Sequence, residues 1–90
     1  MISDPKFPLG QVVTTSNVFD MIPFEIVERC VLRHAKGDWG ELCENDRLAN
    51  EEALDSGGRI LSLYSTTDGT IWIITEADRS FTTVLLPEDY

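Results

Sequence analysis

The residue of this chain with the clearest chemical potential lies near the end of a predicted helix. His34 is the only histidine in the sequence, and it stands four residues before Asp38. An imidazole beside a carboxylate can transfer protons, so His34 and Asp38 are the candidate catalytic residues. No serine or cysteine nucleophile motif accompanies them. A lone histidine near a helix C-terminus is more often structural, because it bonds to the backbone or interacts with the helix dipole.

Trp39 follows Asp38 directly, in a tight connection between Gly37 and Gly40. An indole ring can stack on a base or another ligand, which makes Trp39 a candidate ligand-binding residue. One hypothesis is therefore a small ligand-binding domain or hydrolase with its site at the turn that carries His34, Asp38 and Trp39. The alternative is that Trp39 supplies area to the hydrophobic core.

Acidic residues are concentrated between positions 38 and 55. This segment holds seven carboxylates and one base, Arg47, in a chain whose net charge is −9. Carboxylates three or four residues apart on a helix lie about 5–6 Å from each other, close to the spacing of successive phosphates. Such a surface could occupy the basic groove of a DNA-binding protein, although an ordinary solvated helix face is the competing interpretation. The candidate protein-interaction residues are Asp38, Glu41, Glu44, Asp46, Glu51, Glu52 and Asp55.

Known metal and phosphate motifs are missing from the sequence. The acids do not follow the order of a calcium-binding loop. Cys30 and Cys43 match no zinc spacing, and both are expected to be ordinary thiols. Gly57 and Gly58 end a predicted helix, whereas a phosphate site needs glycines before one. We therefore predict no metal and no cofactor.

The charge of the chain limits its partners. An excess of nine negative charges repels both phosphate backbones and anionic lipids, so we expect no direct binding to nucleic acid. No apolar run approaches the roughly 20 residues of a membrane helix, and positions 1–6 lack a signal-peptide pattern. We expect a cytoplasmic protein whose partner is a protein with a basic surface, for example a nucleic-acid enzyme. A homodimer also remains open, because a chain this short buries limited surface by itself.

The local patterns predict one domain of the α+β class spanning residues 1–90. Apolar positions at helical spacing predict a helix over residues 23–36, which begins with proline and ends before Gly37. A second helix is predicted over residues 44–56. β-Branched runs separated by turn residues predict an antiparallel three-strand meander, preceded by a short edge strand. The edge strand is expected within residues 7–15, where an irregular arm leads into a short β-branched run, and the meander strands cover residues 59–65, 70–75 and 80–86.

These elements suggest an antiparallel sheet of three or four strands with two helices packed on one face. Residues 1–9 are expected to form an irregular N-terminal arm, and residues 87–90 a short C-terminal tail. The three meander strands carry apolar residues on both faces, so we expect the helices to cover the more hydrophobic one.

Several blocks of the chain resemble a known family. In order along the sequence they read RHAKGDWGEL, DRLANEEAL, SGGRILSLY, IWIITEADRS and TTVLLPEDY. They are similar to a family of small plasmid-related proteins found on bacterial plasmids and integrative conjugative elements, sometimes labelled type I restriction endonuclease subunit M. The similarity covers about two-thirds of the chain. A methyltransferase subunit needs a far larger cofactor-binding fold, so the resemblance implies a mobile-element setting rather than that activity.

Our leading hypothesis is a non-enzymatic accessory protein of a mobile genetic element. It would bind another protein through the acidic segment, with a DNA-mimic or anti-defence, antirestriction-like role. The alternatives are the ligand-binding or hydrolytic site at His34, and a structural homodimer or subunit of a complex, for which an exposed apolar sheet face would be the sign.

Overall fold

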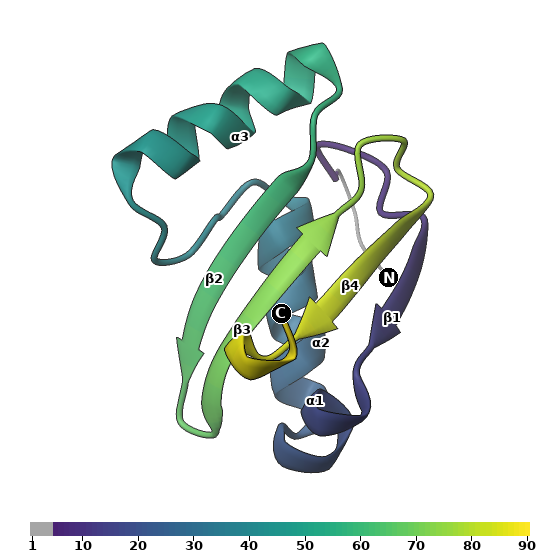
Figure 1. The fold of residues 1–90 in the computed structure, drawn as a ribbon, viewed down its shortest axis with the longest axis vertical. Coiled ribbons are helices and arrows are strands. Elements are labelled where there is room, and N and C mark those ends of the chain that lie inside the picture. Colours follow the sequence, from purple (N-terminus) through teal and green to yellow (C-terminus); the bar gives the residue numbers. More distant parts are fainter. Residues whose placement is uncertain (1–4) are drawn as a thin grey trace.

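The computed structural model describes residues 5–90 and shows an α+β fold (Figure 1). A four-stranded sheet carries one long helix on a face and a second helix beside its edge. Along the chain the elements are β1 (Gln11–Thr14), α1 (Ser16–Met21), α2 (Phe24–Ala35), α3 (Glu44–Ser56), β2 (Ile60–Thr66), β3 (Gly69–Thr75), β4 (Phe81–Leu85) and the 3-10 helix η1 (Pro87–Asp89).

The sheet is mixed rather than antiparallel throughout. Its order is β1-β4-β3-β2, in which β2, β3 and β4 form the predicted antiparallel meander. β1, however, pairs with β4 in the parallel sense. The expectation of an antiparallel sheet was wrong for this strand, because local β-propensity says nothing about the direction in which a distant strand pairs.

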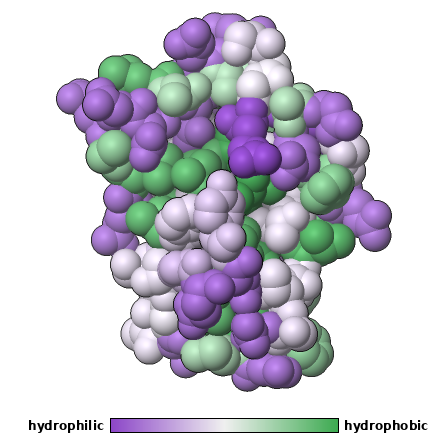
Figure 2. Space-filling view, in the orientation of Figure 1, coloured by the Kyte–Doolittle hydropathy of each residue, from purple (hydrophilic) through white to green (hydrophobic). Residues whose placement is uncertain are grey.

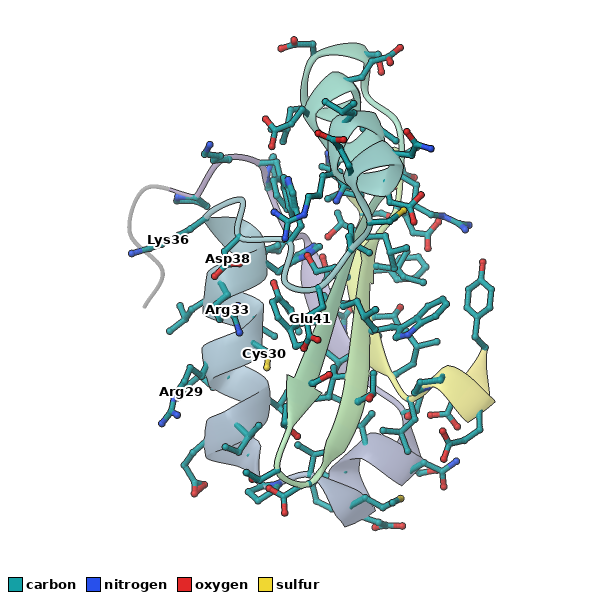
Figure 3. All side chains as sticks on the ribbon, turned by 90° about the vertical axis from the view of Figure 1, so that its left-hand side faces the viewer. Arg29, Cys30, Arg33, Lys36, Asp38 and Glu41 are labelled. Carbon is teal, nitrogen blue, oxygen red and sulfur yellow. The ribbon has the colours of Figure 1, made fainter. Side chains whose placement is uncertain are left out.

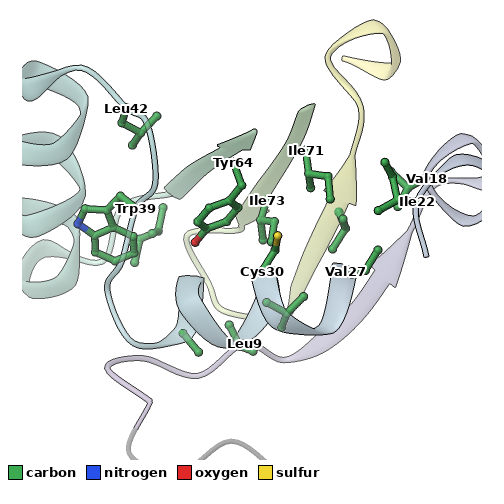
Figure 4. Close-up of a cluster of buried hydrophobic side chains, with 14 of the residues drawn as sticks. Leu9, Val18, Ile22, Val27, Cys30, Trp39, Leu42, Tyr64, Ile71 and Ile73 are labelled. Carbon is green, nitrogen blue, oxygen red and sulfur yellow. The ribbon is translucent and has the colours of Figure 1, made fainter. Parts of the chain in front are cut away.

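Helix α2 covers one face of the sheet and supplies the centre of the core. Its apolar positions face the strands, Glu25 lies in its first turn, and Arg33 lies in its last. These charges favour the helix dipole at both ends. Figure 4 shows Val27 and Cys30 of α2 packed against Ile71 and Ile73 of β3. The first turn begins after Pro23, so the helix follows the predicted period closely.

Helix α3 does not share that face. It packs against the outer edge of β2, where Asn50, Ala53 and Leu54 turn inward (Figure 1). The expectation of two helices on one face was therefore wrong for α3. The apolar stripe of this helix is too narrow to cover a sheet face, since only Asn50 and Ala53 are buried.

The Arg79 guanidinium fixes the C-terminal end of α3. It donates to Ala53 O at 3.1 Å and to Gly58 O at 2.7 Å, and also to Glu76 O in its own turn. Arg79 has a positive φ of 62°, which a non-glycine residue seldom adopts. A cation at this position also offsets the negative end of the helix dipole.

The predicted N-terminal arm and C-terminal tail are both tied to the body. Residues 1–4 of the arm lie outside the described residues, while Phe7 and Leu9 are buried in the core. At the other end, the Asp89 carboxylate accepts hydrogen bonds from Thr15 Oγ1, Asn17 Nδ2 and the Leu86 amide. The tail therefore closes over the start of α1 instead of extending into solvent.

The second face of the sheet is less well covered. Leu61, Leu63 and Trp72 are half-buried there, and Tyr90 packs on Trp72 with 5.2 Å between ring centroids. Figure 2 shows this face, with hydrophobic side chains gathered below the largely hydrophilic surface of α3. Among residues 5–90, no helix is both long and apolar enough to cross a bilayer.

Candidate functional site

His34 lies in the core and has no solvent contact. Its exposed fraction is 0%, and its ring lies edge-on to Phe7 and Trp39, with centroids 5.2 and 6.0 Å away. His34 Nδ1 lies 2.5 Å from Ser62 Oγ, and Nε2 lies 2.9 Å from Thr75 Oγ1. Both ring nitrogens are therefore satisfied by hydroxyl groups of the sheet.

The hydrogen-bond chain beyond Thr75 fixes the tautomer of His34. Thr82 Oγ1 donates to Leu9 O, so it accepts from Thr75 Oγ1 at 2.7 Å. Thr75 Oγ1 has then used its proton and accepts from His34 Nε2–H. Ser62 Oγ consequently donates to His34 Nδ1. The imidazole is neutral and protonated on Nε2, and the chain joins α2 to three strands and the N-terminal arm.

Burial also sets the charge state of the ring. Desolvation lowers the pKa of His34 from 6.5 to about 3, because no carboxylate approaches the imidazole to stabilise its cation. A base with this pKa and no access to solvent is poorly suited to proton transfer at neutral pH. The placement of His34 therefore gives no support to a catalytic site.

Asp38 lies on the surface rather than beside His34. Its carboxylate accepts from Arg33 Nε at 2.7 Å and from Arg33 Nη2 at 3.2 Å, and also from the Gly40 amide. The hydrogen bond from Arg33 lowers the pKa of Asp38. Figure 3 shows Arg33 and Asp38 pointing toward each other at the end of α2. The carboxylate thus closes the turn after the helix.

Trp39 is buried under α3, with 3% of its surface exposed. Its Nε1–H donates to Glu51 Oε2 at 2.8 Å. The indole fills the space between α2 and α3, so its faces pack against protein side chains. The structure thus brings His34 and Trp39 together in the core, while the Asp38 carboxylate points away from both.

The predicted acidic residues separate into two groups. Asp38, Glu41 and Glu51 bond within the chain, Glu41 by accepting from the Ser65 amide at 3.0 Å. Hydrogen bonding from Ser65 lowers the pKa of Glu41. The other acids all lie on α3 and are exposed, and they are Glu44, Asp46, Glu52 and Asp55.

Helix geometry brings together three of these four. At about 100° per residue, Glu44, Glu52 and Asp55 lie within roughly 80° of one another around the axis of α3. Leu48 lies in the middle of this arc and is 60% exposed. Asp46 points to a different side of the helix by the same geometry. We call Glu44, Leu48, Glu52 and Asp55 the α3 outer face. The interaction surface predicted from the sequence consisted of acidic residues alone and did not include Leu48.

No cation inside the described chain neutralises this face. The two ion pairs among residues 5–90 are Arg33–Asp38 and Arg59–Glu76, and neither involves α3. Arg47, the one base of α3, donates to Leu42 O and Gly40 O in the loop before the helix. The outer face therefore presents its negative charge to solvent.

Metal ligands do not converge in the part of the chain that the structure describes. Over residues 5–90, no group of three or more histidine, cysteine, aspartate or glutamate side chains could hold an ion together. Cys30 of α2 is buried in the core, and burial raises the pKa of its thiol. Cys43 is exposed just before α3.

A groove of about 670 Å³ lies between β1, α1 and α2. Its walls include Val12, Phe19, Phe24 and Leu32, with Glu28 as its one charged residue. Phe19 and Phe24 are 79% and 70% exposed. The sequence patterns predicted no site at this groove. The available signal was the pair Phe19 and Phe24 on either side of Pro23, two large apolar residues that no predicted core contact used.

Comparison with family models, with curated proteins and with solved structures found no match to this chain. The resemblance to small plasmid-related proteins therefore stays a prediction.

Proposed function

We propose that this chain is a non-enzymatic accessory protein that binds another protein, one with a basic surface, through the α3 outer face. The observation that carries the proposal is the exposed Leu48 surrounded by Glu44, Glu52 and Asp55, none of which has an ion-pair partner among residues 5–90. This arrangement combines an apolar contact with a ring of uncompensated charge.

The exposed leucine favours a protein partner over simple solubility. A solvated acidic helix needs only charge, and a large apolar side chain in its centre reduces solubility. Protein interfaces commonly place an apolar anchor inside a polar rim, and a helix presents such an anchor to a groove on its partner. Leu48 and its acidic neighbours fit this pattern, and the partner should offer an apolar pocket flanked by lysine or arginine.

Two of the three acids of the α3 outer face are also placed unfavourably for α3 itself. Glu52 and Asp55 lie in the C-terminal half of the helix, near the negative end of its dipole, and the last turn has no basic residue of its own. Residues that oppose the stability of their own helix often serve function. Arg79 offsets the dipole at the carbonyls of this helix end, but among residues 5–90 neither Glu52 nor Asp55 has an ion-pair partner. A partner can supply the positive charge that these two side chains lack.

The nature of the partner is a finer proposal. The spacing of carboxylates on α3 approximates that of nucleic-acid phosphates, so a basic nucleic-acid enzyme is a suitable class. A mobile-element setting and an antirestriction-like role rest on the resemblance of the sequence blocks alone. The rival hypothesis of a site at His34, Asp38 and Trp39 is not favoured, because His34 and Trp39 are enclosed by the core.

Affinity capture from a host lysate, with the tagged chain at low and high salt, tests the proposal. The test variant is Glu44→Gln, Glu52→Gln and Asp55→Asn, which leaves the Trp39–Glu51 hydrogen bond intact. The matched control removes the same number of charges elsewhere, as Asp20→Asn, Asp68→Asn and Glu88→Gln, at exposed positions outside α3.

A protein captured by the native chain and by the control, but lost with the α3 variant and at high salt, is the expected result. Equal loss from both variants would mean that net charge alone causes binding. Capture that persists with the α3 variant would place the binding surface elsewhere, and either result would contradict the proposal.

A further inference from the structure

The two edges of the sheet are treated differently. The outer edge of β2 is covered almost group by group. The Asn50 amide bonds to both the N–H and C=O of Leu61, at 3.1 and 2.6 Å. Leu63 N–H donates to Trp39 O, Leu63 O accepts from the Glu41 amide, and Ser65 N–H donates to the Glu41 carboxylate. No further strand can pair with this edge.

Close packing at Gly40 completes that cover. A Cβ at Gly40 would lie 2.0 Å from Leu63 O, so only glycine allows the loop to follow β2 this closely. Proteins protect edge strands because exposed rows of backbone groups pair with other chains. The β2 edge has this protection.

The opposite edge, β1, is open. Gln11 N–H donates to Ser80 O at 3.1 Å and Thr15 N–H to Val84 O at 3.0 Å, both toward β4. Since backbone groups alternate in direction along a strand, those of Val12 and Thr14 point away from the sheet. They have no hydrogen-bond partner within residues 5–90. The strand contains no charged residue and no proline, either of which would hinder pairing with another strand. All four of its residues are exposed.

We propose that β1 pairs antiparallel with β1 of a second copy of this chain, forming a continuous eight-stranded sheet about a two-fold axis at Val13. In this register Val12 of one copy lies opposite Thr14 of the other, and the two residues exchange both backbone hydrogen bonds. Every outward group of both strands is then satisfied. The short edge is thus complementary to itself, with no group left over.

The apolar surroundings of β1 fit the same arrangement. Val12 and Thr14 point their side chains into the groove beside α2, and the axis brings the grooves of the two copies against each other. Val13 lies on the other face, 37% exposed, and meets Val13 of the second copy at the axis. Phe81, which is 41% exposed, lies on that same face of neighbouring β4.

The charges of α3 do not oppose this dimer, and β1 adds none. β1 carries no charged residue, and the acidic helix α3 lies beside β2 at the far edge of the sheet. Seven strand spacings would separate the two β2 strands, roughly 34 Å. This exceeds the screening length of about 8 Å at physiological ionic strength. A foreign extended strand could use the same edge, but the complete self-complementarity of the register favours a second copy.

The association state of the native chain and two Val12 variants provides the first test. Val12→Pro removes an outward backbone donor and leaves the hydrogen bonds between β1 and β4 in place. An edge strand tolerates proline at a position whose N–H points away from the sheet. Val12→Thr keeps the donor and serves as the matched control. In sedimentation velocity over a wide concentration range, the native chain and Val12→Thr are expected to dimerise and Val12→Pro to remain monomeric with unchanged circular dichroism.

Disulfide formation tests the register itself, in a Cys43→Ser background. Across the axis the two Val13 Cα atoms should lie about 4.5 Å apart, within reach of a disulfide, so Val13→Cys is expected to cross-link on mild oxidation. The control Gln11→Cys places its thiols roughly 14 Å apart along the strands and should not. A monomeric native chain, a dimer unaffected by Val12→Pro, or equal cross-linking at both positions would overturn the proposal. A monomer that binds a foreign peptide at β1 would overturn it as well.

Discussion

At His34 the fold keeps an imidazole neutral by burying it, and hydroxyl groups of the sheet satisfy both of its ring nitrogens. Ser62, Thr75 and Thr82 are all fully buried, and each takes part in the hydrogen-bond chain. Over residues 5–90 no buried side-chain polar atom lacks a partner. A fully satisfied buried network of this kind restricts how the helix can sit on the sheet, because any shift leaves a polar group unpaired.

The neutral state of His34 predicts a defined pH dependence of stability. The pKa of His34 is about 3 in the folded chain and near 6.5 when unfolded, so below pH 6.5 only the unfolded state takes up the proton. The free energy of unfolding should therefore fall as pH drops from 6.5 toward 3, by about 2 kcal/mol at pH 5. Urea unfolding at pH 7.5, 6.5 and 5 measures this loss.

Proton NMR provides the control for this prediction. The chain has a single histidine, so its ring signals are unambiguous. They should not titrate between pH 7.5 and 5 in the folded protein. A midpoint near 6.5 would show a solvated imidazole and contradict the structure around His34.

His34 could be placed correctly from the sequence, but its partners could not. The helical period of residues 24–35 put His34 on the inner stripe. Ser62, Thr75 and Thr82 lie on three different strands, and only the tertiary pairing brings them together. The available signal was that serine and threonine occupy inward positions of the strands. A search for alternating apolar residues overlooks these hydroxyl side chains.

Among the elements, α3 depends on a few specific polar contacts rather than on a broad apolar stripe. Asn50 bonds to the edge of β2, and Arg79 bonds to the carbonyls at the helix end. A helix so attached can leave most of its circumference in solvent. This is the arrangement that allows it to present an interaction surface.

Replacing Arg79 should loosen α3 in particular. Arg79→Asn keeps a residue that tolerates a positive φ but removes the guanidinium, so the expected destabilisation of about 2 kcal/mol reports the lost hydrogen bonds. Arg59→Asn is the matched control, because its ion pair to Glu76 spans 3.5 Å at the surface and should contribute less than about 1 kcal/mol. Chemical denaturation measures both.

Hydrogen exchange locates the effect of the same substitution. Amides of α3 should exchange faster in Arg79→Asn, while those of α2 should change only by the global loss of stability. Two results together would contradict the proposed attachment of α3 by Arg79. They are equally faster amide exchange in α2 and α3, and a stability of Arg79→Asn equal to that of Arg59→Asn.

Element types were more predictable than element positions. α2 could be predicted because its apolar period, first-turn Glu25 and terminal Gly37 agree. The parallel pairing of β1 could not, since four exposed residues carry no pattern that specifies a partner. The edge position of α3 could have been inferred only from the polar Asn50 on its inner side. A residue of this type suits a strand edge better than a hydrophobic face.

For the whole molecule, the sheet separates two surfaces. One edge carries the open strand β1, and the other carries α3 with its outer face (Figure 1). If the β1 edges pair, the two copies present their α3 outer faces at opposite ends of one long sheet. Such a dimer could engage two basic sites at once, which raises the apparent affinity where the spacing of those sites allows it.

The interaction surface of the intact protein can be mapped by photo-cross-linking, which tests the central claim most directly. A photoreactive amino acid would replace Leu48 on α3, or Asp68 in the turn between β2 and β3 at the opposite end of β2. After illumination in host lysate, we expect a discrete protein adduct from position 48 and none from position 68. The α3 charge variant should abolish that adduct. No adduct from position 48, or the same adducts from both positions, would contradict the claim that α3 binds a protein partner.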